Sequence, residues 1–184
     1  MKFAIFLAPG FEESEAIITY DILKRGDQEV ELVNIENKST VISAHQVEIK
    51  TTMKLSDLKF ENFDGFVLPG GIDGVKNLSK NKLVRELISR ANQEQKIIGA
   101  ICAAPLLLSE MGILDEREIV AHPSVVEQLD KKITIDHNSA AITDGHIVTG
   151  ASVGSSFNFA LALADFALET DQILTLRESL EIRD

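Results

Sequence analysis

The sequence predicts an α/β fold with a mainly parallel central sheet, and two observations carry this prediction. Short apolar runs that are too brief for helices, such as Phe3 to Leu7, alternate along the chain with longer segments of helical periodicity. The run from Ile97 to Ile101 is non-polar throughout. Such a run is typical of a strand that is buried on both faces in the middle of a parallel sheet.

In the first half of the chain, strands and helices alternate between turn-forming residues such as Pro9-Gly10 and Gly26. The helix after Pro9-Gly10 has acidic residues in its first turn and basic residues in its last, as the helix dipole favours. The expected elements are a strand over 3–7, a helix over 11–26, a strand over 29–36, a hairpin over 40–44 and 46–52 that turns near Ala44 and His45, a strand from 63 to the Gly70-Gly71 pair, and a helix over 77–95.

The second half continues the alternation and adds another hairpin at Asp144-Gly145, a strong turn signal. The expected elements are a strand over 97–101, a helix that stops at Gly112, a short strand over 119–123, a turn or short helix over 125–129, a candidate strand over 133–136, hairpin strands over 139–143 and 146–149, and helices over 157–168 and 171–182.

Composition limits the classes of function. A chain of 184 residues with 45% hydrophobic residues is expected to form a single domain over residues 1–184. Its net charge of −11 argues against partners with anionic surfaces, both nucleic acids and membranes. One cysteine permits no internal disulfide, which fits a reducing compartment. The first ten residues resemble a strand rather than a signal peptide, and no run is long enough to span a membrane. We therefore expect a cytoplasmic protein.

Cys102, the only cysteine, lies where the buried strand 97–101 changes abruptly into a helix that carries Pro105 in its first turn. A nucleophile at such an elbow is held at the carboxyl edge of the sheet, with helix N–H groups beneath it. The sequence therefore predicts a thiol that ionises more easily than a free one. The alternative is a buried cysteine that acts as a small hydrophobic residue.

Three strand ends carry residues with chemical potential: Glu12 to Glu15 after the first strand, Gly70-Gly71 after the strand that begins at 63, and Cys102. Ligands of open parallel sheets bind beyond the carboxyl ends of the strands. We therefore expect a carboxyl group, free backbone donors and a thiol to meet in one crevice. His122 precedes a proline and is expected to be extended rather than helical, and His45 is expected to be a polar loop residue.

The same segments resemble the ThiJ/PfpI superfamily, and within it the branch of the parkinsonism-associated protein deglycase and bacterial YajL. The resemblance covers essentially the whole chain in order. The motifs that carry it are Gly10-Phe11-Glu12-Glu13-Ser14-Glu15, Phe63-Asp64-Gly65-Phe66-Val67-Leu68-Pro69-Gly70-Gly71, Ala100-Ile101-Cys102-Ala103-Ala104-Pro105, His122-Pro123 and Gly154-Ser155-Ser156-Phe157.

This resemblance implies a flavodoxin-like three-layer sandwich and a homodimer. We expect no cofactor, and no metal site, because the four histidines lie at unrelated positions and the chain has no second cysteine. The resemblance also implies that Cys102 is the nucleophile and that Glu15 is the acid that hydrogen-bonds its sulfur. Gly71 and Ala103, together with Gly70, would supply oxyanion-binding N–H groups, and His122 would lie near the sulfur without direct bonding. A carboxyl beside a thiolate is expected to have a raised pKa.

The chain also departs from related branches. Ala103 follows the nucleophile where protease-like and chaperone-like branches have histidine, and none of its histidines begins the His-x-Glu motif of class I glutamine amidotransferases. Peptidase and amidotransferase activities are therefore disfavoured. The family's Gly-Pro-Gly before the last long helix is replaced by Ser152-Val153-Gly154, which is expected to alter the pocket rim.

Two functions are compatible with these residues. The first is a glyoxalase or deglycase that acts on small dicarbonyls such as methylglyoxal, or on their early adducts, through Cys102 and Glu15. The second is a redox-sensing or chaperone-like stress protein in which Cys102 is oxidised to the sulfinic acid. Because both use the same residues, the sequence does not separate them.

Overall fold

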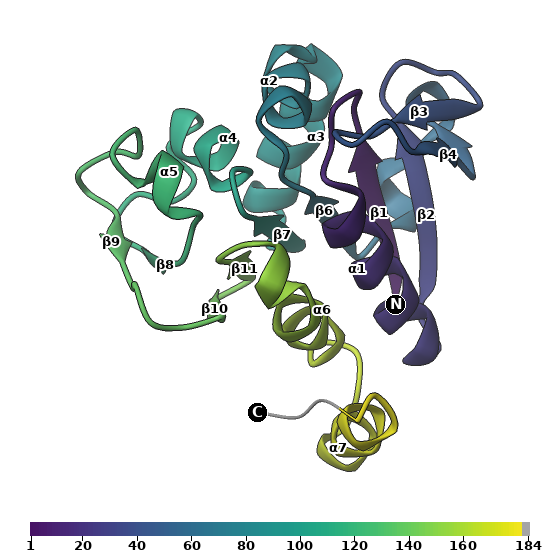
Figure 1. Ribbon diagram of the computed structural model, residues 1–184, viewed down its shortest axis with the longest axis vertical. Coiled ribbons are helices and arrows are strands. Elements are labelled where there is room, and N and C mark those ends of the chain that lie inside the picture. The colour runs from purple at the N-terminus through teal and green to yellow at the C-terminus, as the bar shows by residue number, and fades with distance from the viewer. Residues whose placement is uncertain (182–184) are drawn as a thin grey trace.

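The computed structural model describes residues 1–181 of the chain, and its centre is a sheet of seven strands in the order β10-β11-β7-β6-β1-β2-β5 (Figure 1). The strands are β1 (Lys2–Leu7), β2 (Glu29–Asn34), β5 (Met53–Lys54), β6 (Gly65–Leu68), β7 (Ile97–Ile101), β10 (Ala141–Asp144) and β11 (Ile147–Gly150). Only β10 and β11 pair antiparallel within this sheet. The predicted mainly parallel sheet is confirmed.

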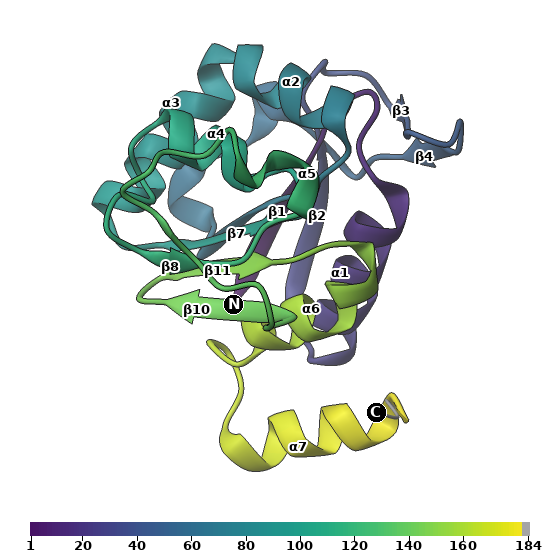
Figure 2. The same ribbon diagram turned by 60° about the vertical axis from the view of Figure 1, so that its left-hand side comes forward.

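Helices cover both faces of the sheet and complete three layers, which Figure 2 shows nearly edge-on. One face carries α1 (Glu13–Arg25) and α6 (Ser156–Ala164), which lie side by side. The other carries α2 (Ile72–Lys80), α3 (Lys82–Gln93) and α4 (Pro105–Glu110), with the short α5 (Pro123–Val126) beside them. The last helix, α7 (Thr170–Ser179), packs against α6.

The residues of strand β1 explain its place in the centre of the sheet. Phe3, Ile5 and Leu7 point toward α1 and α6, whereas Ala4 and Phe6 point toward the opposite layer of helices, and all five side chains are fully buried. A strand buried on both faces needs non-polar residues at every position and the neighbours that only a central place provides. The apolar run therefore determines that β1 lies inside the sheet.

The helix predicted over 77–95 is wrong as a single element, because it is two helices. Its first part, α2, begins earlier, at Ile72, and ends at Lys80. Asn81 then adopts an extended conformation, and its side chain accepts a hydrogen bond from the N–H of Val84 at 3.1 Å. Asparagine is a strong N-cap residue, and here it starts α3.

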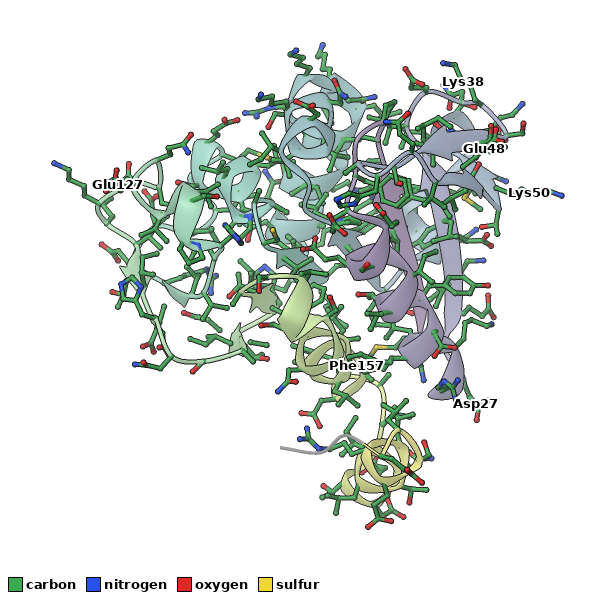
Figure 3. All side chains as sticks on the ribbon, viewed as in Figure 1. Asp27, Lys38, Glu48, Lys50, Glu127 and Phe157 are labelled. Atoms are coloured by element: carbon green, nitrogen blue, oxygen red, sulfur yellow. The ribbon has the colours of Figure 1, made fainter. Side chains whose placement is uncertain are left out.

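Two small sheets lie outside the main one. The predicted hairpin that turns at Ala44 and His45 is confirmed as β3 (Thr40–Ile42) and β4 (Glu48–Lys50). Charged side chains on and beside this hairpin, including Lys38, Glu48 and Lys50, point outward (Figure 3). The strand predicted over 119–123 is shorter than expected, and it does not join the main sheet. It is β8 (Glu118–Ile119), which pairs with β9 (Thr134–Ile135).

The remaining differences concern element ends. The β10–β11 turn is Gly145-His146, one residue later than predicted, since Asp144 still pairs with Ile147. The helix predicted over 157–168 is α6, which ends at Ala164, and α7 ends at Ser179, so the predicted end at Ile182 lies outside the described residues. Short 3₁₀ turns complete the fold at η1 (Leu55–Asp57), η2 (Phe60–Asn62) and η3 (Val153–Ser155).

The order of the strands fixes the place of the site. Strand β6 lies between β1 and β7, and the three run parallel, so their carboxyl ends meet at one edge. The residues that follow these strands are therefore neighbours in space. No helix within residues 1–181 has the length and apolar character needed to cross a membrane.

Candidate active site

Cys102 lies directly after β7 in a left-handed conformation, with φ of +64°. Its N–H donates to the carbonyl of Gly150, and its carbonyl accepts from the N–H of His122, each at 2.9 Å. A non-glycine residue in this region costs about 1–2 kcal/mol, so these two hydrogen bonds hold the cysteine in a strained position. The predicted elbow between strand and helix is thus confirmed.

Glu15 brings its carboxyl group to the same place from the first turn of α1. It is 1% exposed, and its Oε2 accepts the N–H of Gly70 at 2.7 Å. Its Oε1 is buried and has no hydrogen-bond partner among the described residues. The Cys102 thiol is close enough that each group changes the pKa of the other. The structure therefore distinguishes Glu15 from its neighbours Glu12 and Glu13, which have different surroundings.

Gly70 is the residue that allows this approach. A Cβ atom there would lie 2.7 Å from both Glu15 Oε2 and Cys102 Cβ, and 3.1 Å from the sulfur. Any side chain would therefore separate the carboxyl from the thiol. Gly70 was expected to be an oxyanion donor, but its N–H is already donated to Glu15. Its role in the structure is to position the carboxyl group.

The N–H groups of Gly71 and Ala103 are directed at the sulfur and lower the pKa of the Cys102 thiol. Gly71 has φ of +83°, and a Cβ there would lie 2.4 Å from the carbonyl oxygen of Gly10. Only glycine fits this position. The structure thus brings together at the sulfur two of the three backbone donors that the sequence analysis named.

Burial is the largest cause of the pKa shifts of Cys102 and Glu15. Burial, followed by the negative charge of Glu15 and its hydrogen bond, raises the pKa of the Cys102 thiol to about 12, although the N–H groups of Gly71 and Ala103 act in the opposite direction. Burial also raises the pKa of Glu15 to about 7. The prediction that the thiol ionises more easily than a free one is therefore wrong. Near pH 7 the Glu15 carboxyl is therefore about half ionised, while the Cys102 thiol keeps its proton.

His122 is next to the site without bonding to the sulfur. As predicted, its backbone is extended, and its ring caps α5 by accepting the N–H of Ser124 at 3.2 Å through Nδ1. The same nitrogen lies 2.8 Å from the Ser124 hydroxyl. His122 contacts Cys102 through its backbone N–H, which donates to the Cys102 carbonyl. An accepting Nδ1 leaves the ring proton on Nε2.

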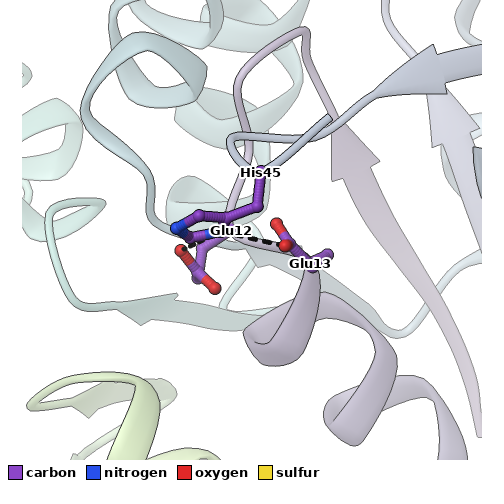
Figure 4. A group of neighbouring side chains, drawn as sticks. All are labelled: Glu12, Glu13 and His45. Carbon is purple, nitrogen blue, oxygen red and sulfur yellow. Dashed lines mark hydrogen bonds and ion pairs between the residues drawn. The ribbon is translucent and has the colours of Figure 1, made fainter. Parts of the chain in front are cut away.

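Glu12, Glu13 and His45 form a second polar group at the end of β1 (Figure 4). His45 Nδ1 lies 2.9 Å from Glu13 Oε1 and 3.8 Å from Glu12 Oε2. Within the described part of the chain, this group could offer a metal ion three ligand atoms within 4.8 Å of one another. This group was not predicted from the sequence, because His45 comes from the β3–β4 hairpin, 32 residues from Glu13. The charge of Glu12 also contributes to the raised pKa of Glu15.

Comparisons with known proteins agree on one family. The family model described as DJ-1/PfpI matches residues 1–165. The glutathione-independent glyoxalase DJR-1.2 of Caenorhabditis elegans is 30% identical over 89% of this chain and 88% of its own length. The crystal structure of Drosophila melanogaster DJ-1beta superposes with a TM-score of 0.94 at 27% identity, covering 100% of this chain and 98% of that one. Oxidized Toxoplasma gondii DJ-1 superposes with a TM-score of 0.91 at 26% identity, covering 97% of each chain.

The charge of the pair can be tested by titrating thiolate absorbance. We expect no thiolate signal from wild-type protein at pH 7, with Cys102→Ser as the blank, because burial and the Glu15 carboxylate keep the thiol protonated. Glu15→Gln removes the neighbouring charge and should move the thiol midpoint to lower pH. A wild-type midpoint at or below the free-thiol value of about 8.5 would contradict this assignment.

Proposed function

Because the chain belongs to the DJ-1/PfpI family, we propose that it is a cysteine-dependent enzyme that acts on small dicarbonyls such as methylglyoxal, or on their early adducts with amines. One observation carries this proposal: the buried carboxyl of Glu15 lies beside the Cys102 thiol, and two backbone N–H groups are directed at the sulfur. A base, a nucleophile and donors for a developing oxyanion are then within reach of a single carbonyl group. The relative named as a glyoxalase supports the same class of reaction.

The reaction begins with the Glu15 carboxylate, which takes the thiol proton as the sulfur bonds to the aldehyde carbon. The N–H groups of Gly71 and Ala103 stabilise the negative charge that develops on the aldehyde oxygen. Glu15 then returns its proton to that oxygen, and the product is a neutral hemithioacetal. The carboxylate is again free to act as a base.

Isomerisation and hydrolysis complete the reaction. Glu15 removes the hydrogen of the former aldehyde carbon as a proton and delivers it to the adjacent carbon. The hydroxyl proton of the former aldehyde carbon passes to the oxygen of the adjacent carbonyl group, so the hemithioacetal becomes a thioester of a 2-hydroxy acid. Water hydrolyses the thioester, releases the acid and restores the thiol, so the sum is addition of one water molecule. The unpartnered Oε1 of Glu15 suits this role because no described residue competes for the proton it would carry.

Steady-state kinetics with methylglyoxal, without glutathione, test the proposal. The wild type should reach a kcat/KM of about 10⁴ M⁻¹s⁻¹ or more, and Cys102→Ala should abolish it. Glu15→Gln should lower kcat/KM by about 10²-fold or more, whereas Glu13→Gln, a matched change in the same helical turn, should retain most of it. Because Glu15 must be ionised to act as a base, the rate should rise with pH through about 7. A wild type no faster than Cys102→Ala would refute the enzyme.

The second candidate function is redox sensing through oxidation of Cys102 to the sulfinic acid. This alternative is supported by the similar structure of Toxoplasma gondii DJ-1, which is described as oxidized. In this chain, Glu15 Oε1 is free to donate a hydrogen bond to an oxidised sulfur if it is protonated. Negligible turnover with a selective mass gain of two oxygens at Cys102 in dilute peroxide would favour the sensor. Both proposals include a cytoplasmic location, where a lone thiol stays reduced.

We further propose that His122 assists proton transfer at Cys102. Its backbone N–H donates a hydrogen bond to the Cys102 carbonyl, and any residue at 122 except proline could do the same. A test of proton transfer must therefore change the imidazole ring. Asparagine can replace the ring as the α5 cap but cannot shuttle a proton. We expect both His122→Ala and His122→Asn to lower kcat by about tenfold. If His122→Asn has wild-type kcat, the ring acts only as a cap.

We also propose a homodimer, as the family resemblance implies. Ile17 of α1 is 37% exposed, and Phe157 of the neighbouring α6, which Figure 3 shows at the surface, is 40% exposed. Exposed large apolar side chains on adjacent helices suit an interface. Sedimentation velocity should give a dimer for the wild type and for Asp27→Ala, which lies on a surface turn, but a monomer for Phe157→Glu. A monomeric wild type would contradict this.

A further inference from the structure

A cavity of about 330 Å³ lies between α2 and α4 and is lined by Ala103, the residue after the nucleophile. Its lining includes Ala103, which follows Cys102 and directs an N–H at the sulfur, and Ile72, which follows the other donor, Gly71. The lining therefore includes one donor residue, Ala103, and the chain neighbour of the other.

Four apolar side chains form one part of the cavity lining. Val75 is 3% exposed and Ala103 is 1% exposed, and they line the space together with Leu106 and Ile72. A cavity of about 150 Å³ with such a lining can hold a benzene ring. The space is thus large enough for an aromatic or branched side group, and these four side chains cannot hydrogen-bond to a polar one.

The charged part of the lining consists of two lysines and one glutamate. Lys76 and Lys80 project from successive turns of α2, whereas the whole chain has a net charge of −11. Lys76 is 3.4 Å from Asp73, and Glu110 on the opposite side is 3.4 Å from Arg85. The side chain of Lys80 makes no ion pair or hydrogen bond with any residue of the described range 1–181. It is the free cation at this opening.

We infer that this cavity is a substrate subsite, and that the preferred substrates are α-oxoaldehydes whose apolar side group ends in a carboxylate. The inference rests on the proposed function, because it assigns the part of the substrate that does not react. The apolar side group would lie among Val75, Ala103 and Leu106, and the carboxylate would pair with Lys80. Methylglyoxal would use the reacting centre and leave the subsite empty.

Three substrates separate these contributions: methylglyoxal, phenylglyoxal and 4-carboxyphenylglyoxal. Wild-type kcat/KM should be highest for 4-carboxyphenylglyoxal. Lys80→Glu should lower the ratio of kcat/KM for the carboxylated over the plain phenyl substrate by about fivefold, through KM. Lys82→Glu changes the net charge equally on a residue that does not line the cavity, and it should leave that ratio unchanged.

A second variant tests the apolar part. Leu106→Trp narrows the cavity and should lower kcat/KM for both phenyl substrates by about tenfold relative to methylglyoxal. The subsite is refuted if Lys80→Glu and Lys82→Glu change the carboxylate ratio equally, or if Leu106→Trp leaves the phenyl-to-methyl ratio unchanged.

A binding measurement keeps this result separate from the proposed reaction. The expected product 4-carboxymandelate, titrated onto the Cys102→Ser protein, should shift the methyl NMR signals of Ile72 and Leu106, and mandelate should do so less. If the wild type does not convert methylglyoxal but these shifts occur, the reaction is wrong and the subsite stands. If no shift occurs at saturating 4-carboxymandelate, the subsite is wrong whether or not the enzyme turns over.

Discussion

The site depends on the hydrogen bond from the Gly70 N–H to Glu15 Oε2. A carboxyl group that is 1% exposed is costly to bury, and this bond offsets part of the cost while fixing the group against the end of β6. The bond joins residues 55 positions apart, so it forms only when α1 and the central strands have packed. Because Gly70 has no side chain, the same contact leaves Glu15 beside Cys102.

Much of the fold and the centre of the site could be predicted from the sequence. Local signals sufficed for the buried strands and for the elbow at Cys102, because each depends on residues that are adjacent in the chain. The convergence of Glu15, Gly71 and Cys102 followed from the rule that parallel strands end at one edge. The break at Asn81 was missed because its side chain could equally lie inside a helix or begin one.

Two kinds of feature could not be predicted from the sequence. One is a pKa that depends on several opposing effects, and the other is a contact between residues that lie far apart in the chain. The charge state of Cys102 combines burial, a nearby carboxylate and two N–H donors, and only the structure gives their relative size. The elbow position suggested that the donors would prevail, but the burial effect is larger. The group formed by His45 with Glu12 and Glu13 requires the hairpin to fold back over α1, and no local pattern records that.

The left-handed backbone at Cys102 has a consequence for the evolution of the chain. Glycine would relax this residue at no steric cost, yet it would remove the sulfur, so local stability and reactivity favour different residues at position 102. A protein that keeps cysteine here carries a lasting disadvantage in folding free energy. Drift toward a more stable sequence would therefore tend to erase the nucleophile first, and only continued use of the thiol opposes that drift.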